Sequence, residues 1–186
     1  MLARIPSAAR FDNVAVAMHW LVALLAIAVV VLGWLIPEAP RGSAWREWLL
    51  ILHRSLGLVI LLAMLFRAVW RFNHPPPHLP ASLARVEVVV AHLTHFLLYA
   101  VFVAMALAGY VNTAAAGHSI SLFGIVGIPP LIPEDQRLAQ WAFAAHLAGQ
   151  FAIYALVAMH VAAALLHLLI RRDGVFERML PARRGG

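Results

Sequence analysis

Histidines are the side chains of this sequence whose number and spacing could do chemistry. The chain has ten histidines and no cysteine. Three of the ten are expected in loops. The other seven lie in or at the ends of long apolar runs, where an ionisable side chain is costly and therefore indicates a function. They are His19, His53, His92, His95, His146, His160 and His167.

The last three of these histidines would share one face of a helix. His160 follows His146 by 14 residues and His167 follows seven residues later, so at about 100° per residue all three fall within about 60°. His146 and His160 would lie about 21 Å apart along the helix axis, too far for one metal ion. The spacing predicts two sites. For any single histidine, a hydrogen bond between helices is an alternative interpretation.

The composition identifies the environment of these residues. Of the 186 residues, 63% are hydrophobic and 12% are charged, and the mean hydropathy is +0.86. A water-soluble domain of this composition would lack a polar surface, so the sequence predicts a membrane protein. The lack of cysteine excludes iron–sulfur clusters and a covalently attached c-type haem. The formal charge is +6, but every cationic residue is an arginine and most flank apolar runs, so we expect no nucleic-acid partner.

Four apolar runs are long enough to cross about 30 Å of hydrocarbon, which takes about 20 helical residues. They cover residues 14–36, 48–70, 88–111 and 138–170. We predict an all-α integral membrane protein, a four-helix transmembrane bundle that forms a single domain over residues 1–186. The first run has 23 residues, too long for the apolar part of a signal peptide, so we expect it to be retained. The connection over residues 112–137 is expected to cap the outer surface.

The arginines indicate how the bundle is oriented. Ten of them fall on the side that holds both termini and the second loop, and three fall in the other two loops. Arg54 lies just inside the second run. The positive-inside rule then places both termini in the cytoplasm.

Depth in the membrane pairs histidines of different helices. The fourth helix runs inward, so His146 lies near the outer face and His160 toward the inner face. His53 begins the second helix on the outside, and His19 lies near the inner start of the first helix. Two facing imidazoles suit the axial positions of a haem iron, whereas structural zinc takes four converging ligands. We therefore predict two b haems stacked across the bilayer, held by His53 with His146 and by His19 with His160.

Small and charged residues lie beside these histidines. Gly57 is one turn after His53, and Gly149 is nearly one turn after His146. Both glycines could leave room for a flat macrocycle or allow close helix packing. Arg54 could neutralise a haem propionate or extend to the outer interface.

Two further histidines indicate a site for a quinone. His95 begins the third helix and His167 ends the fourth, both at the inner interface, where an apolar-tailed carrier would place its polar head. Quinone reduction takes up protons, and a histidine with its ordinary pKa of about 6.5 can relay them. We interpret His92 as a polar residue packed beside His95.

The chain resembles the bacterial di-haem cytochrome b561 family of small membrane cytochromes. The resemblance is carried by AVAMHWLVALL, LHRSLGLVILL with LFRAVWRFNHPPP, AHLTHFLLYA and AAHLAGQFAIYALVAMHVAAALLHLLIRRD. It implies a bacterial inner-membrane protein with haem ligands at His19, His53, His146 and His160. It also implies a quinone, such as ubiquinone, near His95 and His167.

The resemblance implies an oxidoreductase that takes single electrons at the periplasmic face and passes them through two haems to quinone. Some members of this family are superoxide oxidases. Four arginines near the outer haem would attract the superoxide anion: Arg41, Arg46, Arg54 and Arg137. We expect Arg54, His95 and His167 to act in the reaction.

Other interpretations stay open at this stage. The loop arginines could simply pair with four nearby carboxylates: Glu38, Glu47, Glu134 and Asp135. The chain could instead be a membrane subunit that links a periplasmic dehydrogenase or hydrogenase to the quinone pool. A third and weaker interpretation is a histidine-lined metal or proton transporter without haem.

Overall fold

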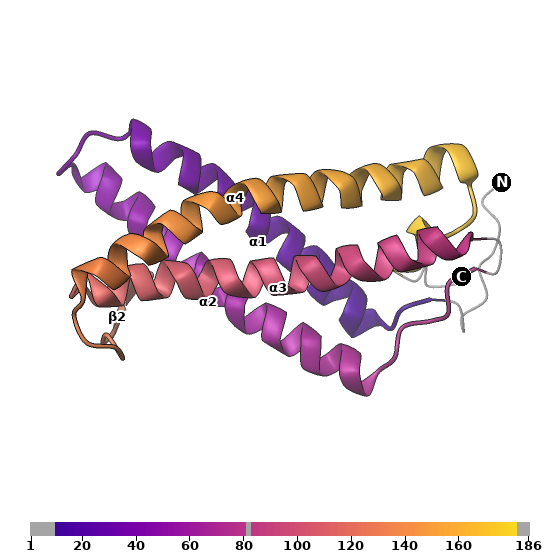
Figure 1. The fold of residues 1–186 in the computed structure, drawn as a ribbon, viewed down its shortest axis with the longest axis horizontal. Helices are drawn as coiled ribbons and strands as arrows, with labels where there is room; N and C mark the ends of the chain where they lie inside the picture. The colour runs from indigo at the N-terminus through magenta and orange to yellow at the C-terminus, as the bar shows by residue number, and fades with distance from the viewer. Residues whose placement is uncertain (1–9, 81–82, 182–186) are drawn as a thin grey trace.

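Four long helices form an elongated bundle in the computed structural model, which describes residues 10–80 and 83–181 (Figure 1). They are α1 (Asn13–Glu38), α2 (Ala44–Asn73), α3 (Arg85–Ala115) and α4 (Gln136–Leu165), and α4 continues as a π-helical turn, η2 (Leu166–Arg171). All four are long and apolar enough to cross a membrane. The predicted fold class is confirmed.

Side chains outside the apolar runs decide where the helices begin. The first N–H groups of a helix have no partner within it, so a polar side chain just before the helix stabilises it. Asp12 accepts a hydrogen bond from the N–H of Ala15, and Ser43 accepts one from the N–H of Arg46. Asp135 caps α4 in the same way. The helices therefore start one to four residues before the predicted apolar runs.

The helices pack as two pairs that cross each other (Figure 1). Helix α1 packs mainly on α2 and helix α3 on α4, while contacts between α2 and α3 join the pairs. Val22, Ile60 and Met64 form a buried cluster between α1 and α2, and Phe102 of α3 packs against it. Within the described residues, α4 makes few close backbone approaches to α1 or α2. The side chains that meet across this boundary therefore decide how the pairs are held.

The connection between α3 and α4 holds a β-hairpin that the sequence analysis did not predict. Strands β1 (Ile120–Leu122) and β2 (Val126–Ile128) pair antiparallel. The hydroxyl of Ser55 in α2 accepts a hydrogen bond from the N–H of Phe123 at 2.8 Å. The hairpin thus lies on α2 as well as covering one end of the bundle (Figure 1). We call this the loop end.

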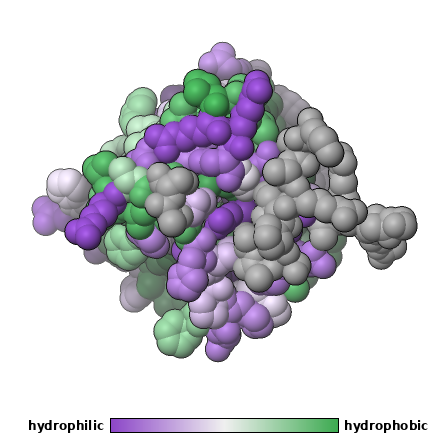
Figure 2. Space-filling view, turned by 90° about the vertical axis from the view of Figure 1, so that its right-hand side faces the viewer, coloured by the Kyte–Doolittle hydropathy of each residue, from purple (hydrophilic) through white to green (hydrophobic). Residues whose placement is uncertain are grey.

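The opposite end, where Arg10 hydrogen-bonds to the carbonyl of Leu180, is called the terminal end. Hydrophilic side chains gather on it among hydrophobic ones (Figure 2). There Arg171 pairs with Glu87 and ties η2 to the start of α3. The short helix η3 (Phe176–Met179) folds back on α1, because the indole N–H of Trp20 donates to its last carbonyl at 2.7 Å.

Asp12 joins two helices at the terminal end as well as capping α1. Both of its carboxylate oxygens lie 3.1 Å from the indole nitrogen of Trp70 in α2, which donates to them. Burial alone would raise the pKa of Asp12, but hydrogen bonds from Ala15 and Trp70 outweigh burial and hold the pKa below its usual 3.8. Asp12 is therefore ionised near neutral pH.

We expect Asp12→Ala to lower the free energy of unfolding by about 1 kcal/mol, because the cap of α1 loses its acceptor. The measurement is reversible unfolding in mixed micelles, followed by circular dichroism. Asp12→Asn keeps an acceptor for both N–H donors and should lose clearly less. An equal loss in the two variants would show that charge, and not hydrogen bonding, gives Asp12 its effect.

Candidate functional site

Two histidines face each other toward the loop end. His53 of α2 and His146 of α4 have ring centroids 6.0 Å apart, with the ring planes inclined by 72°. A bond from a metal ion to an imidazole nitrogen is about 2 Å long, so two imidazoles on one ion have centroids about 6 Å apart. The spacing of this pair therefore fits one iron between the rings.

Backbone carbonyls fix the orientation of both rings. The Nδ1 atom of His53 lies 3.1 Å from the carbonyl oxygen of Val29, and that of His146 lies 2.9 Å from the carbonyl oxygen of Met105. A carbonyl oxygen only accepts, so each Nδ1 carries the hydrogen and donates it. The lone pair of Nε2 is then free, which is the form of imidazole that binds a metal.

Two glycines bring other helices close to these rings. A Cβ atom at Gly33 of α1 would lie 3.4 Å from Cε1 of His53, and one at Gly109 of α3 would lie 3.3 Å from Cε1 of His146. A larger residue at either position would push on the histidine ring. The sequence analysis missed both glycines because they lie on helices other than those of the rings they touch.

The two glycines that the sequence analysis did single out differ from each other. A Cβ atom at Gly149 would collide with the sulfur of Met105 in α3. Gly149 thus lets the Met105 side chain of α3 pack directly on α4. A Cβ atom at Gly57 would have no atom within 4 Å, so the space beside Gly57 is open.

Three histidines gather at the level nearer the terminal end. The ring centroids of His19 in α1 and His160 in α4 are 6.0 Å apart, the same separation as in the first pair. His95 of α3 lies on another side of His160, with centroids 5.5 Å apart. The structure thus brings together the residues of both predicted pairs and adds His95 to the second. Within the described residues, no three potential ligands converge on a single ion position.

An arginine contacts the second pair inside the bundle. The Nη1 atom of Arg67 lies 3.5 Å from Nδ1 of His19, and the guanidinium lies 5.5 Å from the ring centre of Tyr99. A guanidinium only donates, so here Nδ1 of His19 accepts and the ring hydrogen is on Nε2. His19 would have to leave this weak contact to bind a metal through Nε2. From the sequence, Arg67 had no predicted role beyond its positive charge.

His167 and His95 have different partners, although the sequence predicts that both serve one quinone. The Nδ1 atom of His167 lies 2.7 Å from Oδ2 of Asp173, and both side chains are largely buried. Asp173 was missed because it follows two arginines, where a carboxylate would ordinarily balance charge. His92, expected beside His95, is exposed, and its Nδ1 bonds to the carbonyl of Val88 in its own helix.

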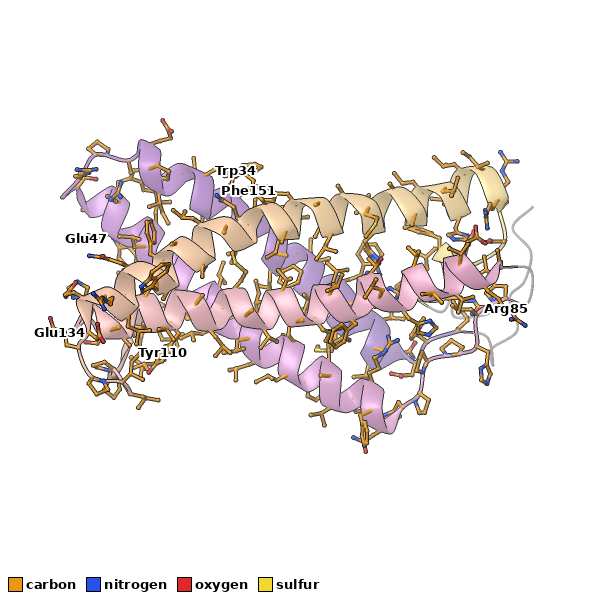
Figure 3. The ribbon with its side chains drawn as sticks, viewed as in Figure 1. Trp34, Glu47, Arg85, Tyr110, Glu134 and Phe151 are labelled. Atoms are coloured by element: carbon orange, nitrogen blue, oxygen red, sulfur yellow. The ribbon has the colours of Figure 1, made fainter. Side chains whose placement is uncertain are left out.

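The arginines of the loop end do not pair with carboxylates in the described part of the chain. The ion pairs among the described residues are those of Arg171 with Glu87 and of His167 with Asp173, both at the terminal end. Arg46 instead donates to the carbonyls of Ile36 and Ala39 at the end of α1. Glu47 and Glu134 lie at this end (Figure 3), and neither pairs with an arginine among the described residues. Arg54 is partly buried in α2 and has no hydrogen bond or ion pair with a described residue.

The fold defines a class of protein, a four-helix membrane bundle, in which pairs of histidines face each other at two levels. A family model described as prokaryotic cytochrome b561 matches residues 10–182, and the chain belongs to this family. It is therefore a bacterial membrane protein of electron transfer, an oxidoreductase that binds haem b. This membership replaces the interpretation as a transporter without haem.

Curated relatives match along nearly their whole length. Cytochrome b561 homolog 2 of Escherichia coli (strain K12) is 29% identical over 171 residues, which cover 92% of this chain and 91% of the relative. A probable superoxide oxidase, CybB of Yersinia pestis, is 29% identical over 180 residues, covering 95% of this chain and 98% of the relative. Cytochrome b561 homolog 1 of Escherichia coli (strain K12) is 26% identical over 179 residues, covering 94% and 99%. The resemblance stated from the sequence is confirmed.

Proposed function

We propose that the chain, acting as one domain over residues 1–186, holds two b haems. One would lie between His53 and His146 and the other between His19 and His160. The observation that carries this proposal is the 6.0 Å separation of the rings in both pairs. When bound, each haem would supply reversible transfer of one electron. Because His146 and His160 share one helix, the two sites would be about 21 Å apart along its axis.

The proposed orientation places both termini in the cytoplasm and the loop end in the periplasm. Most arginines belong to the terminal end, as the positive-inside rule requires of a cytoplasmic side. Three arginines of this count, Arg4, Arg183 and Arg184, lie outside the described residues.

The proposed electron donor is superoxide, which would react at the loop end. An arginine without a partner in a membrane span is costly and indicates a function. Arg54 is such a residue, next to His53 in α2, and its charge would raise the local concentration of a small anion. The name of the Yersinia pestis relative also supports this substrate. Two superoxide anions would each lose one electron and become dioxygen.

The proposed electron acceptor is ubiquinone or another quinone, bound near the terminal end. A quinone becomes a quinol by taking up two electrons and two protons. His95 lies beside His160, and His167 is held by the carboxylate of Asp173. The carboxylate accepts from Nδ1 of His167, so a proton taken up on Nε2 would be the one donated to a quinone oxygen. These residues would bind the head group and relay protons.

A second candidate function is that of a membrane subunit joining a periplasmic dehydrogenase or hydrogenase to the quinone pool. The observation in its favour is the apolar surface of the loop end, where the side chains of Ile125 and Leu131 are 85% and 77% exposed. Exposed apolar residues outside the spans are typical of a protein interface. Purification from native membranes distinguishes the two functions, because only a subunit retains a stoichiometric partner.

Replacing the proposed ligands by alanine should remove haem signals in pairs, because an iron that loses one axial histidine loses half of its protein coordination. We expect His19→Ala and His160→Ala to deplete one component in a redox titration, and His53→Ala and His146→Ala to deplete the other. His118→Ala, in an exposed loop, is the control. Loss of the same component from His19→Ala and His146→Ala would overturn the pairing.

Replacing His95 or His167 by alanine should leave both haem signals in place and slow quinone reduction about ten-fold or more, since these residues are assigned to proton transfer. The measurement compares visible spectra with stopped-flow reduction of ubiquinone-1. His92→Ala, on the same helix as His95, is the control and should reduce quinone at the original rate. Haem loss in His95→Ala would show that His95 and not His19 is the partner of His160.

Superoxide should reduce the haems of the purified protein, and Arg54→Gln should slow this reduction about ten-fold at low salt while both haems stay bound. The rate of the original protein should fall with ionic strength, because the attraction is electrostatic. Arg85→Gln, which removes the same charge from an exposed position at the terminal end, is the matched control. If superoxide leaves the haems oxidised while an added quinol reduces them, superoxide is not the donor and the subunit function is favoured instead.

A further inference from the structure

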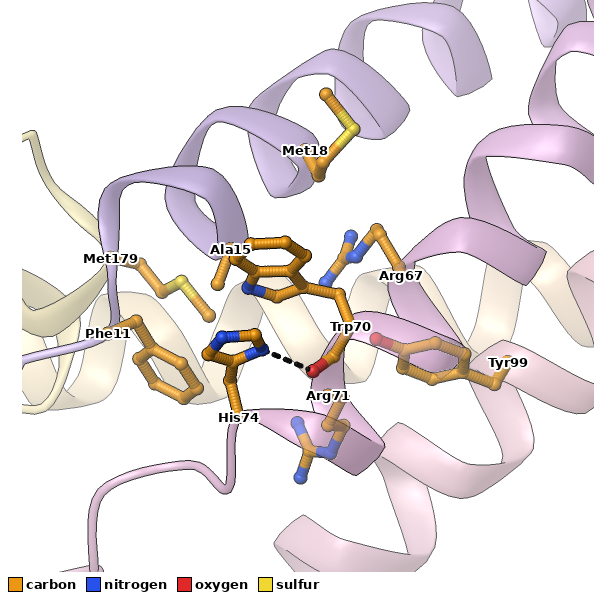
Figure 4. A pocket seen from close by; sticks show the side chains of 9 residues that line it. All are labelled: Phe11, Ala15, Met18, Arg67, Trp70, Arg71, His74, Tyr99 and Met179. Atoms are coloured by element: carbon orange, nitrogen blue, oxygen red, sulfur yellow. Dashed lines mark hydrogen bonds between the residues drawn. The ribbon is translucent and has the colours of Figure 1, made fainter.

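A pocket lies at the terminal end between the start of α1 and the end of α2 (Figure 4). The last turns of α2 supply most of its polar lining, with Arg67, Trp70, Arg71 and His74. Tyr99 of α3 lines it on one side. The Trp70 and His74 rings stack at a centroid distance of 4.0 Å and give the pocket a flat wall.

The lining of this pocket is cationic without a matching anion. None of its lining residues is acidic. Within the described part of the chain, Arg67 and Arg71 form no ion pair, and Arg71 has no hydrogen bond. The carboxylate of nearby Asp12 is already engaged by Ala15 and Trp70. Among the described residues these two guanidinium groups near the end of a membrane span are therefore available to bind an anion.

A shallow, wide-open apolar groove on the lipid-facing side of α2 and α3 adjoins the pocket at Tyr99. Its volume is about 390 Å³, and Tyr99 lines both the groove and the pocket. Three small residues, Ala68, Ala100 and Ala104, leave this space where larger side chains would fill it. The pocket itself has a volume of about 20 Å³, so an anionic head would lie at its mouth beside Arg67 and Arg71, with an apolar chain along the groove.

We propose that the pocket and groove bind an anionic phospholipid, with its phosphate at Arg67 and Arg71 and one acyl chain along α2 and α3. Guanidinium groups bind phosphate oxygens through paired hydrogen bonds, and basic pockets between membrane helices bind anionic head groups. The uncharged head of a quinone does not call for two cations. His95 and His167, assigned to the quinone, do not line this pocket.

The first test is a lipid titration of the delipidated, haem-loaded protein by native mass spectrometry. The probes are dioleoylphosphatidylglycerol and dioleoylphosphatidylcholine, which share their acyl chains and differ in net charge. We expect tighter binding of the phosphatidylglycerol and its selective release by 0.5 M salt, roughly the range where surface charges are screened. Equal binding of the two lipids would overturn the proposal, and so would displacement of phosphatidylglycerol by an equimolar amount of ubiquinone.

The second test assigns the head group to Arg71. Arg71→Gln should weaken phosphatidylglycerol binding about five-fold and phosphatidylcholine binding clearly less, because the choline cation already offsets the phosphate charge of the second lipid. Arg85→Gln is the matched control, because Arg85 lies at the same end (Figure 3) but outside the pocket. An equal effect of the two variants would reject the pocket as the site. Visible spectra of both variants verify that the bundle and its haems are intact.

The third test assigns the acyl chain to the groove. Ala104→Leu should fill part of the groove and weaken binding of both lipids. Ala155→Leu is the control, on the exposed side of α4 that lies about 180° from His146. Inorganic phosphate at equal concentration should not displace phosphatidylglycerol. Displacement by phosphate, or unchanged binding in Ala104→Leu, would show an anion site without a chain site and would overturn the lipid proposal.

Discussion

The facing of imidazoles across one side of α4 is the interaction on which this architecture depends. Helix α4 packs along α3. Toward α1 and α2, the rings of His146 and His160 in α4 lie close to histidine rings of those two helices. A metal group bound between two such rings would add strong bonds where the packing of α4 on α1 and α2 is sparse. A group that binds only to the folded protein stabilises the folded state by its free energy of binding. In the proposed arrangement, haem binding and the assembly of the two helix pairs would therefore be coupled.

The rings of the two histidine pairs have the same separation but different hydrogen-bond partners. Near the loop end, His53 and His146 both donate to backbone carbonyls, and such hydrogen bonds make an imidazole a more electron-rich ligand. At the other level, the charge of Arg67 lies beside His19. A nearby cation stabilises an added electron, and hydrogen bonds and net charge are among the factors that set haem potentials. In the proposed arrangement, the hydrogen bonds favour an electron at the terminal-end pair, while each level has a nearby cation, Arg54 in sequence beside His53 and Arg67 in contact with His19.

The sequence predicted what depends on position along a helix and failed where contacts depend on the rotation of one helix against another. The spans and the level-matched pairs follow from hydropathy and from the 14 residues between His146 and His160. Gly33 and Gly109 approach the rings from neighbouring helices, which no single-helix pattern reveals. The strands of the hairpin have three residues each, too short for an alternating pattern to be recognised. Polar caps such as Asp12 explain why the helix starts were predicted late.

Toward each of its ends, helix α2 carries an arginine that pairs with no carboxylate of the described residues. Arg54 and Arg71 are 17 residues apart, which is about 26 Å along a helix and close to the thickness of the hydrocarbon layer. Each guanidinium can therefore reach a different interface, where water lowers the cost of its charge. A different anion from each aqueous side can then bind each of the two guanidinium groups. This placement lets one helix present a cation beside the loop-end histidines and another beside the lipid head groups, with the buried contact of Arg67 and His19 kept between them.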